Sequence, residues 1–303
     1  MQYFPLFVDT QSLKVLVIGA GDVASRKLDL LSRTQAQIHV IAIEACQDAL
    51  NYAEQGRISL ELRAVTEADI NGADLLYLCT ADTALNEQLA VFAKEQGIWA
   101  NVVDNPKFCR FITPSIVDRG RLQIAISTAG AAPVYARELR ARLESWLPQS
   151  LSPLFDFIAE RREEVQQRLP VFKQRRVFWE QFFTRNDSRF DADTQSHYEA
   201  SFAMQAQQGE LLLIDSGTAP ELLPIGAMPY LQKIEVTFSR LSVPFGLNEI
   251  LRRDASYSDH YDESTIAELL AKGESCLVYG DPAEITHLVK LFPAARHLQA
   301  GSF

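Results

Sequence analysis

Short apolar runs alternate with helical patterns over the first 127 residues of the chain. Runs with the length and composition of buried strands occur at 14–18, 38–43, 58–63, 75–79, 98–103 and 122–127. A helical pattern follows the first run, and another occupies about 84–96. Strands that alternate with helices in this way predict an α/β domain with a parallel, doubly wound sheet.

The pattern changes after Pro133. Residues 133–146 and 152–185 are helical in pattern and rich in charge, residues 186–208 are polar, and a new apolar run begins at 210–214. Further strands are expected near 234–238 and 276–279. We therefore expect four parts, which are a sheet domain over 1–113, a connecting region over 114–150, a helical domain with linker over 151–208 and a small α/β domain over 209–303.

Composition narrows the class of protein. A net charge of −10 on 303 residues argues against a nucleic-acid surface. The first residues lack the basic start of a signal peptide, and no apolar stretch is long enough to cross a membrane. The four cysteines are scattered, without a CxxC pair, as suits a reducing compartment. We expect a cytoplasmic protein that binds neither nucleic acid nor membrane.

The first strand runs directly into a glycine-rich turn. Gly19, Gly21 and Ala24 fit the pattern G-x-G-x-x-G/A, with Asp22 and Val23 between them. The first glycine permits the tight turn, the second lets the backbone approach a pyrophosphate, and the alanine allows close helix packing. The sequence therefore predicts a Rossmann-type dinucleotide site, with phosphates at the helix N-terminus. A tight turn without a ligand is the alternative.

The end of the second strand bears on the choice of dinucleotide. Ile41 and Ala42 stand where an acidic ribose ligand is usual, but Glu44 follows two residues later, and no basic residue is present for a 2′-phosphate. This pattern favours NAD over NADP. After the fourth strand, Thr80 and Asp82 either lie near the cofactor or, for Asp82, cap the following helix.

Asp104 is the best candidate for acid–base chemistry. It follows the fifth strand, at the edge of the sheet where a nicotinamide would lie, and the only histidine before residue 197 is His39, inside a strand. A carboxylate at this place can accept a proton during hydride removal or contact a divalent cation. The alternative is an Asx turn, since Asp-Asn-Pro is a good turn sequence.

Many basic and hydroxyl-bearing side chains follow Asp104 in the sequence. The cations are Lys107, Arg110, Arg119, Arg137 and Arg140, and the hydroxyl-bearing loops are 113–115 and 127–130. In an acidic protein such a cluster suggests a substrate with several carboxylates. Ordinary surface charge is the alternative for any single residue.

Several separated motifs together resemble the siroheme synthase family, in its precorrin-2 dehydrogenase/sirohydrochlorin ferrochelatase module. The likeness covers residues 1 to about 185. The matching stretches are 4–7 (FPLF), 17–27 (VIGAGDVASRK), 101–107 (NVVDNPK), 111–115 (FITPS), 133–137 (PVYAR) and 175–183 (RRVFWEQFF).

The resemblance implies NAD-dependent oxidation of precorrin-2 to sirohydrochlorin and insertion of ferrous iron, in a homodimer with 114–150 as dimerisation region. It implies that Asp104 serves both steps and contacts the metal transiently. The residues it implies for the cofactor, beside the glycine turn and Thr80, are Asp22, Val23, Ile43 and Glu44. For the tetrapyrrole, the expected contacts are Lys107, Arg110, Ser115, Arg119, Ser127, Thr128 and Arg137, with Thr128 standing where relatives carry a serine.

Residues 209–282 resemble, more weakly, the first half of a uroporphyrinogen-III methyltransferase domain. The glycine-rich GxGPGD loop of that family is replaced by residues 215–221 (DSGTAPE). We therefore expect a degenerate domain that folds but does not methylate. Two other functions stay open for the whole chain, namely a dehydrogenase without chelatase activity and a non-catalytic sensor that binds NAD or a tetrapyrrole.

Overall fold

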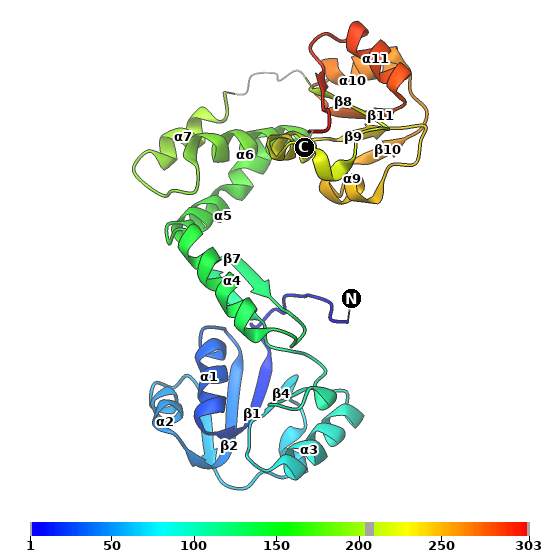
Figure 1. The fold of residues 1–303 in the computed structure, drawn as a ribbon. Helices are drawn as coiled ribbons and strands as arrows, with labels where there is room; N and C mark the ends of the chain where they lie inside the picture. The colour runs from blue at the N-terminus through cyan, green and yellow to red at the C-terminus, as the bar shows by residue number, and fades with distance from the viewer. Residues whose placement is uncertain (1, 204–208, 302–303) are drawn as a thin grey trace. The chain divides into compact units, whose positions relative to one another are not determined.

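The computed structural model describes residues 2–203 and 209–301 (Figure 1). The chain divides into two compact units, residues 1–198 and 199–303. Part of the expected linker, residues 204–208, lies outside the described residues.

The first unit begins with a five-stranded parallel sheet in the order β3-β2-β1-β4-β5. Its strands are β1 (Lys14–Ala20), β2 (Gln37–Ala45), β3 (Ser59–Leu62), β4 (Leu75–Leu78) and β5 (Trp99–Val102). The connections contain α1 (Asp22–Leu31), α2 (Gln47–Glu54), the short 3-10 helix η1 (Glu67–Ile70) and α3 (Thr83–Glu95). This confirms the predicted doubly wound α/β sheet.

Alternation along β1 explains why both faces of the sheet are covered. Val15 and Val17 belong to an apolar cluster with Ala24 and Leu28 of α1. Leu16 and Ile18 point to the opposite face and pack in the cluster that contains Leu89 of α3. Because successive side chains of a strand face opposite ways, one buried strand holds helices on both sides (Figure 1).

The prediction of a sixth parallel strand is wrong. β7 (Leu122–Ile126) pairs antiparallel with β6 (Ser115–Arg119) as a separate two-stranded hairpin. Gly120, with φ +69°, lies in the two-residue turn between Arg119 and Leu122. A parallel strand would need a long crossover from β5, whereas the chain after β5 holds only the 3-10 helix η2 (Pro106–Phe108) before β6.

Four helices follow the hairpin. They are α4 (Pro133–Trp146), α5 (Leu151–Arg168), α6 (Phe172–Asn186) and α7 (Thr194–Ala200), and the division between the units falls within α7. The helices α5, α6 and α7 share an aromatic core, in which Phe157, Phe178 and Phe182 surround Tyr198 with ring centroids 5.4–6.3 Å away. The Tyr198 hydroxyl donates to Glu164 at 2.8 Å, so the buried phenol is satisfied.

The second unit is another parallel sheet, in the order β10-β9-β11-β8-β12. Its strands are β8 (Leu211–Asp215), β9 (Val236–Phe238), β10 (Ser256–Ser258), β11 (Cys276–Gly280) and β12 (Arg296–His297). Its helices are η3 (Pro220–Leu222), η4 (Ile225–Ala227), α8 (Met228–Leu231), α9 (Phe245–Ile250), α10 (Glu263–Ala271) and α11 (Pro282–Leu291). All three strand regions predicted after residue 209 are present.

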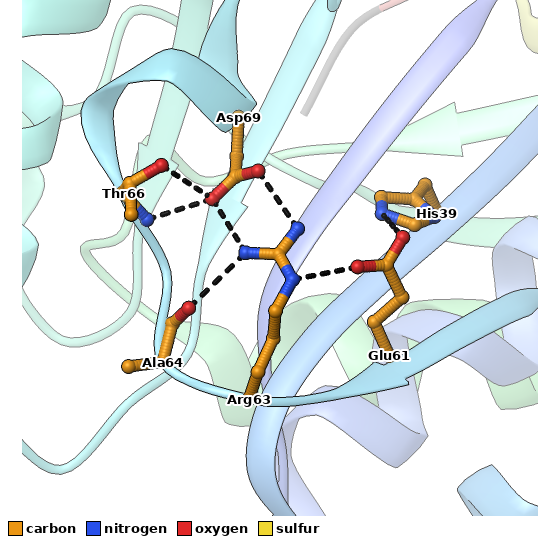
Figure 2. Close-up of polar contacts among 6 residues, drawn as sticks. All are labelled: His39, Glu61, Arg63, Ala64, Thr66 and Asp69. Atoms are coloured by element: carbon orange, nitrogen blue, oxygen red, sulfur yellow. Dashed lines mark hydrogen bonds and ion pairs between the residues drawn. The ribbon is translucent and has the colours of Figure 1, made fainter.

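An ion-pair network secures the crossover that leaves β3 (Figure 2). The Arg63 guanidinium donates to both carboxylate oxygens of Asp69 at 2.8 Å and to Glu61 at 2.6 Å. Asp69 also accepts from the backbone N–H of Thr66, which caps η1. On the other side, Glu61 lies 3.4 Å from the ring of His39, so this histidine is a structural partner of β3. The Arg63 guanidinium holds the pKa of Asp69 well below its usual range.

Replacing Asp69 by Asn will lower the free energy of unfolding of the first unit at neutral pH by a small amount, since the pair lies near the surface. A carboxyl whose pKa is depressed by folding stabilises the folded state above its unfolded pKa of about 3.8, and this contribution is lost as the pH falls toward the folded value. Urea unfolding of wild type and variant between about pH 7 and about pH 3 should show the difference narrowing. A difference that stays constant over this range would contradict the assignment.

Candidate functional site

The turn between β1 and α1 is packed directly against the end of β4. Gly19 has φ +97°, and a Cβ built on it would lie 2.8 Å from the carbonyl oxygen of Cys79. Only glycine fits this backbone and this approach. Ala24, completely buried in the first turn of α1, keeps the helix close to the sheet. Gly19 therefore makes the tight turn, and Ala24 the close packing, that the sequence predicts, and Gly19 in addition allows the close approach to Cys79.

The second glycine leaves open space instead. A Cβ at Gly21 would meet no atom within 4 Å, and Gly21 is the N-cap of α1 without any side-chain hydrogen bond to the helix. Asp22 and Val23 are exposed at the same end. The first N–H groups of a ten-residue helix thus face an uncrowded surface, which is the arrangement that binds a pyrophosphate.

The end of β2 lies beside this turn. The parallel register places Ala45 opposite Ala20, and the two residues before Ala45 are exposed, Ile43 by 77% of its surface. An apolar side chain and the Glu44 carboxylate next to the glycine turn suit the adenosine half of a dinucleotide.

Thr80 and Asp82 organise the start of α3. The Thr80 hydroxyl donates to Asn86 at 2.7 Å, and the Asn86 amide donates back to the Thr80 carbonyl at 2.9 Å. Asp82 accepts from the backbone N–H of Leu85 at 3.0 Å. Of the two interpretations of Asp82, the structure shows the helix cap.

Asp104 stands two residues beyond β5, at the same edge of the sheet as the glycine turn. It is exposed and has φ +58°, a left-handed conformation that is uncommon for a residue with a Cβ. Within the described residues its carboxylate has no hydrogen bond or ion pair. The neighbouring Asn105 is held instead, since its amide donates to Glu87 of α3 at 2.9 Å. The turn therefore presents a free carboxylate on a fixed backbone.

The chain then returns along β5. Lys107 is exposed in η2 near Asp104, whereas the backbone N–H of Arg110 donates to Ala100 at 2.9 Å. The Arg110 guanidinium lies 5.6 Å from the ring centroid of Trp99, the first residue of β5. Arg110 is thus at the opposite end of β5 from Asp104.

A cavity of about 700 Å³ brings together three of the predicted substrate contacts, Arg110, Ser127 and Thr128. Its apolar wall comes from residues 3–8, Trp99 and Phe111–Ile112. The hydroxyls of Ser127 and Thr128 accept from the N–H groups of Ala129 and Ala132, so they also shape the loop before α4. Asp104 and Lys107 do not line this cavity. Ser115 begins β6, and Arg137 is exposed on α4.

Arg119 has a structural place. It is only 4% exposed, and its guanidinium donates to the carbonyls of Glu144 and Leu147 at the end of α4 and lies 2.6 Å from the Glu144 carboxylate. Because its donors are occupied inside the unit, we leave it out of the proposed substrate site. Sequence patterns alone did not separate it from the exposed cations.

Two further polar residues near the edge were not singled out by the sequence analysis, Lys27 of α1 and Asn101 of β5. The buried amide of Asn101 donates to the carbonyl of Phe111 at 2.9 Å and so holds the segment that returns along β5.

The cysteines near this edge are not activated. Burial raises the pKa of the Cys79 thiol to about 11 and also raises that of Cys109. Neither thiol is therefore poised as a thiolate nucleophile.

Residues 2–203 and 209–301 contain no helix that is long and apolar enough to cross a membrane. The same residues contain no cluster of three or more His, Cys, Asp or Glu side chains placed to hold a metal ion.

The glycine turn, the open helix end and the parallel sheet define a dinucleotide-binding protein of the Rossmann class. Comparisons with known families agree. The model described as "Putative NAD(P)-binding" matches residues 6–115, "Sirohaem biosynthesis protein central" matches 119–145, and "Sirohaem synthase dimerisation region" matches 150–194. Over residues 119–194 the chain is thus similar to siroheme synthases, directly after a match to an NAD(P)-binding model.

Curated relatives extend the likeness. A siroheme synthase of Pseudoalteromonas atlantica is 40% identical over 265 residues, covering 84% of this chain and 57% of that protein. One of Nitrosococcus oceani is 36% identical, with 84% and 56% covered. The chain thus spans about half the length of these relatives. An alignment of 265 residues is longer than the first unit, so the similarity continues into the second unit. The solved structure "SirC, precorrin-2 dehydrogenase" shares the fold, with a TM-score of 0.53 at 22% identity over 66% of this chain and 99% of that chain.

The two glycines allow a matched prediction. Gly21→Ala will raise the Kd for NAD by about tenfold or more, because the added methyl group occupies the space of the pyrophosphate, while the melting temperature stays unchanged. Gly19→Ala will lower the melting temperature, because its Cβ clashes with Cys79. Calorimetric titration and thermal unfolding measure both. Loss of stability in the Gly21 variant, with unchanged NAD binding, would contradict the placement.

Arg119→Met will lower the free energy of unfolding by about 2–4 kcal/mol, because the carbonyls at the end of α4 lose buried donors. The control is Arg121→Met, whose ion pair with Asp156 is exposed and is expected to contribute less than about 1 kcal/mol. Chemical unfolding compares the two. Equal stability of the two variants would show that the Arg119 contacts do not stabilise the fold.

Proposed function

We propose that this chain oxidises precorrin-2 to sirohydrochlorin with NAD and then inserts ferrous iron to form siroheme. The observation that carries the proposal is the placement of Asp104. Its free carboxylate stands at the same sheet edge as the open N-terminus of α1, with β4 between β5 and β1. A hydride acceptor bound at that helix and a base at that carboxylate would meet at one edge.

The residues around the glycine turn fit NAD. The N–H groups after Gly21 would hold the pyrophosphate, with Ile43 and Glu44 on the adenosine side and Thr80 toward the nicotinamide. The chain offers no cation beside Glu44 that would favour a 2′-phosphate. When bound, NAD would supply the hydride acceptor. Proton transfer and substrate binding would depend on the side chains of this protein.

In the first reaction precorrin-2 loses a hydride and a proton, and Asp104 takes the proton. Its exposure and its lack of internal partners leave both oxygens free for this. In the second reaction sirohydrochlorin loses two pyrrole protons as ferrous iron enters. The same carboxylate would accept protons and contact the iron transiently, since weak oxygen ligation lets the metal pass on to the macrocycle.

The carboxylates of the tetrapyrrole need cations and hydrogen-bond donors. Lys107 and Arg137 are exposed, and Arg110 with Ser127 and Thr128 lines the cavity at the other end of β5. We propose these residues, together with Ser115, as the substrate contacts. Such a set suits an anionic, largely apolar ring.

Exposed apolar residues support a homodimer. Phe4, Phe7, Val134 and Tyr135 are exposed by 57–78%, which is costly on an isolated surface. They accompany the matched dimerisation region at 150–194. The sequence-based boundary at 114–150 for dimerisation differs from this match, so we propose that residues 150–194 take part in the dimer together with 114–150. We keep 1–113 for NAD binding, 151–208 as the helical domain with linker and 209–303 as a degenerate methyltransferase-like domain. The four free cysteines support a cytoplasmic location.

The test is an anaerobic assay of the full chain with precorrin-2 and NAD, followed by NADH formation and by the sirohydrochlorin spectrum. Asp104→Asn will lower kcat by about a hundredfold or more, because the amide cannot accept the proton. Asp156→Asn, an exposed carboxylate of α5, is the matched control and should retain full activity.

Addition of ferrous iron then separates the two enzyme functions. A siroheme spectrum supports the bifunctional enzyme, and its absence after normal oxidation leaves a dehydrogenase alone. Binding of NAD and tetrapyrrole without turnover would refute the enzyme and favour a sensor.

A further inference from the structure

Lys27 lies on α1 one turn beyond Val23, on the side of the helix that faces β4. Its ammonium group is 5.9 Å from the ring centroid of Tyr77, in the middle of β4, and the residue is half-buried. Side chains of a helix lean toward its N-terminus, which in α1 is the end that carries Gly21.

Among the described residues, Lys27 makes no ion pair with a carboxylate. Its titratable neighbours include a phenol and two thiols, those of Tyr77, Cys79 and Cys109. Burial raises the pKa of all three, so they are neutral at physiological pH. A half-buried ammonium beside neutral groups is suited to bind an anion.

The groups next to Lys27 lie on the β4–β5 side of the sheet. Tyr77 is the register partner of Asn101 in β5, its hydroxyl lies 3.3 Å from that of Thr113, and its ring meets Phe111 edge-on at 5.2 Å. Phe111 and Thr113 belong to the segment that follows Asp104. The adenosine side, with Glu44, lies across β1 on β2.

We propose that Lys27 binds a carboxylate of the tetrapyrrole substrate and thereby fixes the macrocycle against the nicotinamide side of the dinucleotide. This inference rests on the function proposed above. The pyrophosphate is already matched by the N–H groups after Gly21, and a nicotinamide ring brings no negative charge. The side chains of an anionic substrate are therefore the partners that fit a cation on the β4 side.

The test compares Lys27→Met, which removes the charge at similar length, with Lys27→Arg, which keeps it. Lys94→Met, at an exposed position near the end of α3, is the control. In the full chain we expect Lys27→Met to raise the KM for precorrin-2 by about tenfold, the loss of one charge-assisted hydrogen bond, with kcat changed by less than about twofold. Lys27→Arg should recover most of the affinity, and the Kd for NAD should be unchanged in all variants.

Direct binding of sirohydrochlorin, followed by its absorbance, separates this inference from the proposed function. If the wild type binds sirohydrochlorin but does not oxidise precorrin-2, the enzyme proposal fails, and about tenfold weaker binding by Lys27→Met would still support Lys27 as a carboxylate ligand. Unchanged KM and unchanged sirohydrochlorin affinity in Lys27→Met would overturn the inference. So would a parallel rise in the Kd for NAD, which would assign the cation to the cofactor.

Discussion

The contact between Gly19 and the end of β4 is the constraint on which the candidate site depends. Because a Cβ at Gly19 would lie 2.8 Å from the Cys79 carbonyl, β1 can turn into α1 only with glycine at this point. The turn directs the N–H groups of α1 toward the sheet edge. The same edge carries the Thr80–Asn86 hydrogen bonds between the end of β4 and α3, and Asp104 beyond β5. This backbone contact therefore brings the open end of α1 against the end of β4, at the edge where we propose the cofactor and the base.

Local signals predicted much of this arrangement. The five parallel strands, the glycine turn and the position of Asp104 follow from short apolar runs and from residues adjacent in the chain. The pairing of β7 could not be predicted in this way, because a run of alternating residues does not reveal which strand it pairs with. In the structure β7 pairs with the neighbouring strand β6. Arg119 was likewise indistinguishable from Arg110 in the sequence, since only the fold brings the carbonyls of Glu144 and Leu147 to its guanidinium.

The proposed substrate residues form two groups along β5. Asp104 and Lys107 follow its carboxyl end, whereas Arg110 and Thr128 border the cavity near Trp99 at its amino end. Lys27 lies over the middle of the neighbouring strand, beside Tyr77. The two groups are separated because the segment after Asp104 runs back along β5, so that Arg110 lies beside Ala100. The spacing of these residues in the sequence does not indicate this return. A large flat substrate with carboxylates around its rim is the kind of ligand that would engage separated cations.

The most direct test is a crystal structure of the full chain with NAD and sirohydrochlorin bound together. We expect the pyrophosphate to contact the N–H groups after Gly21 and the macrocycle to lie between the nicotinamide and the Asp104 carboxylate. It would be contradicted by a macrocycle held wholly in the cavity of Arg110 and Thr128, out of contact with both Asp104 and the nicotinamide.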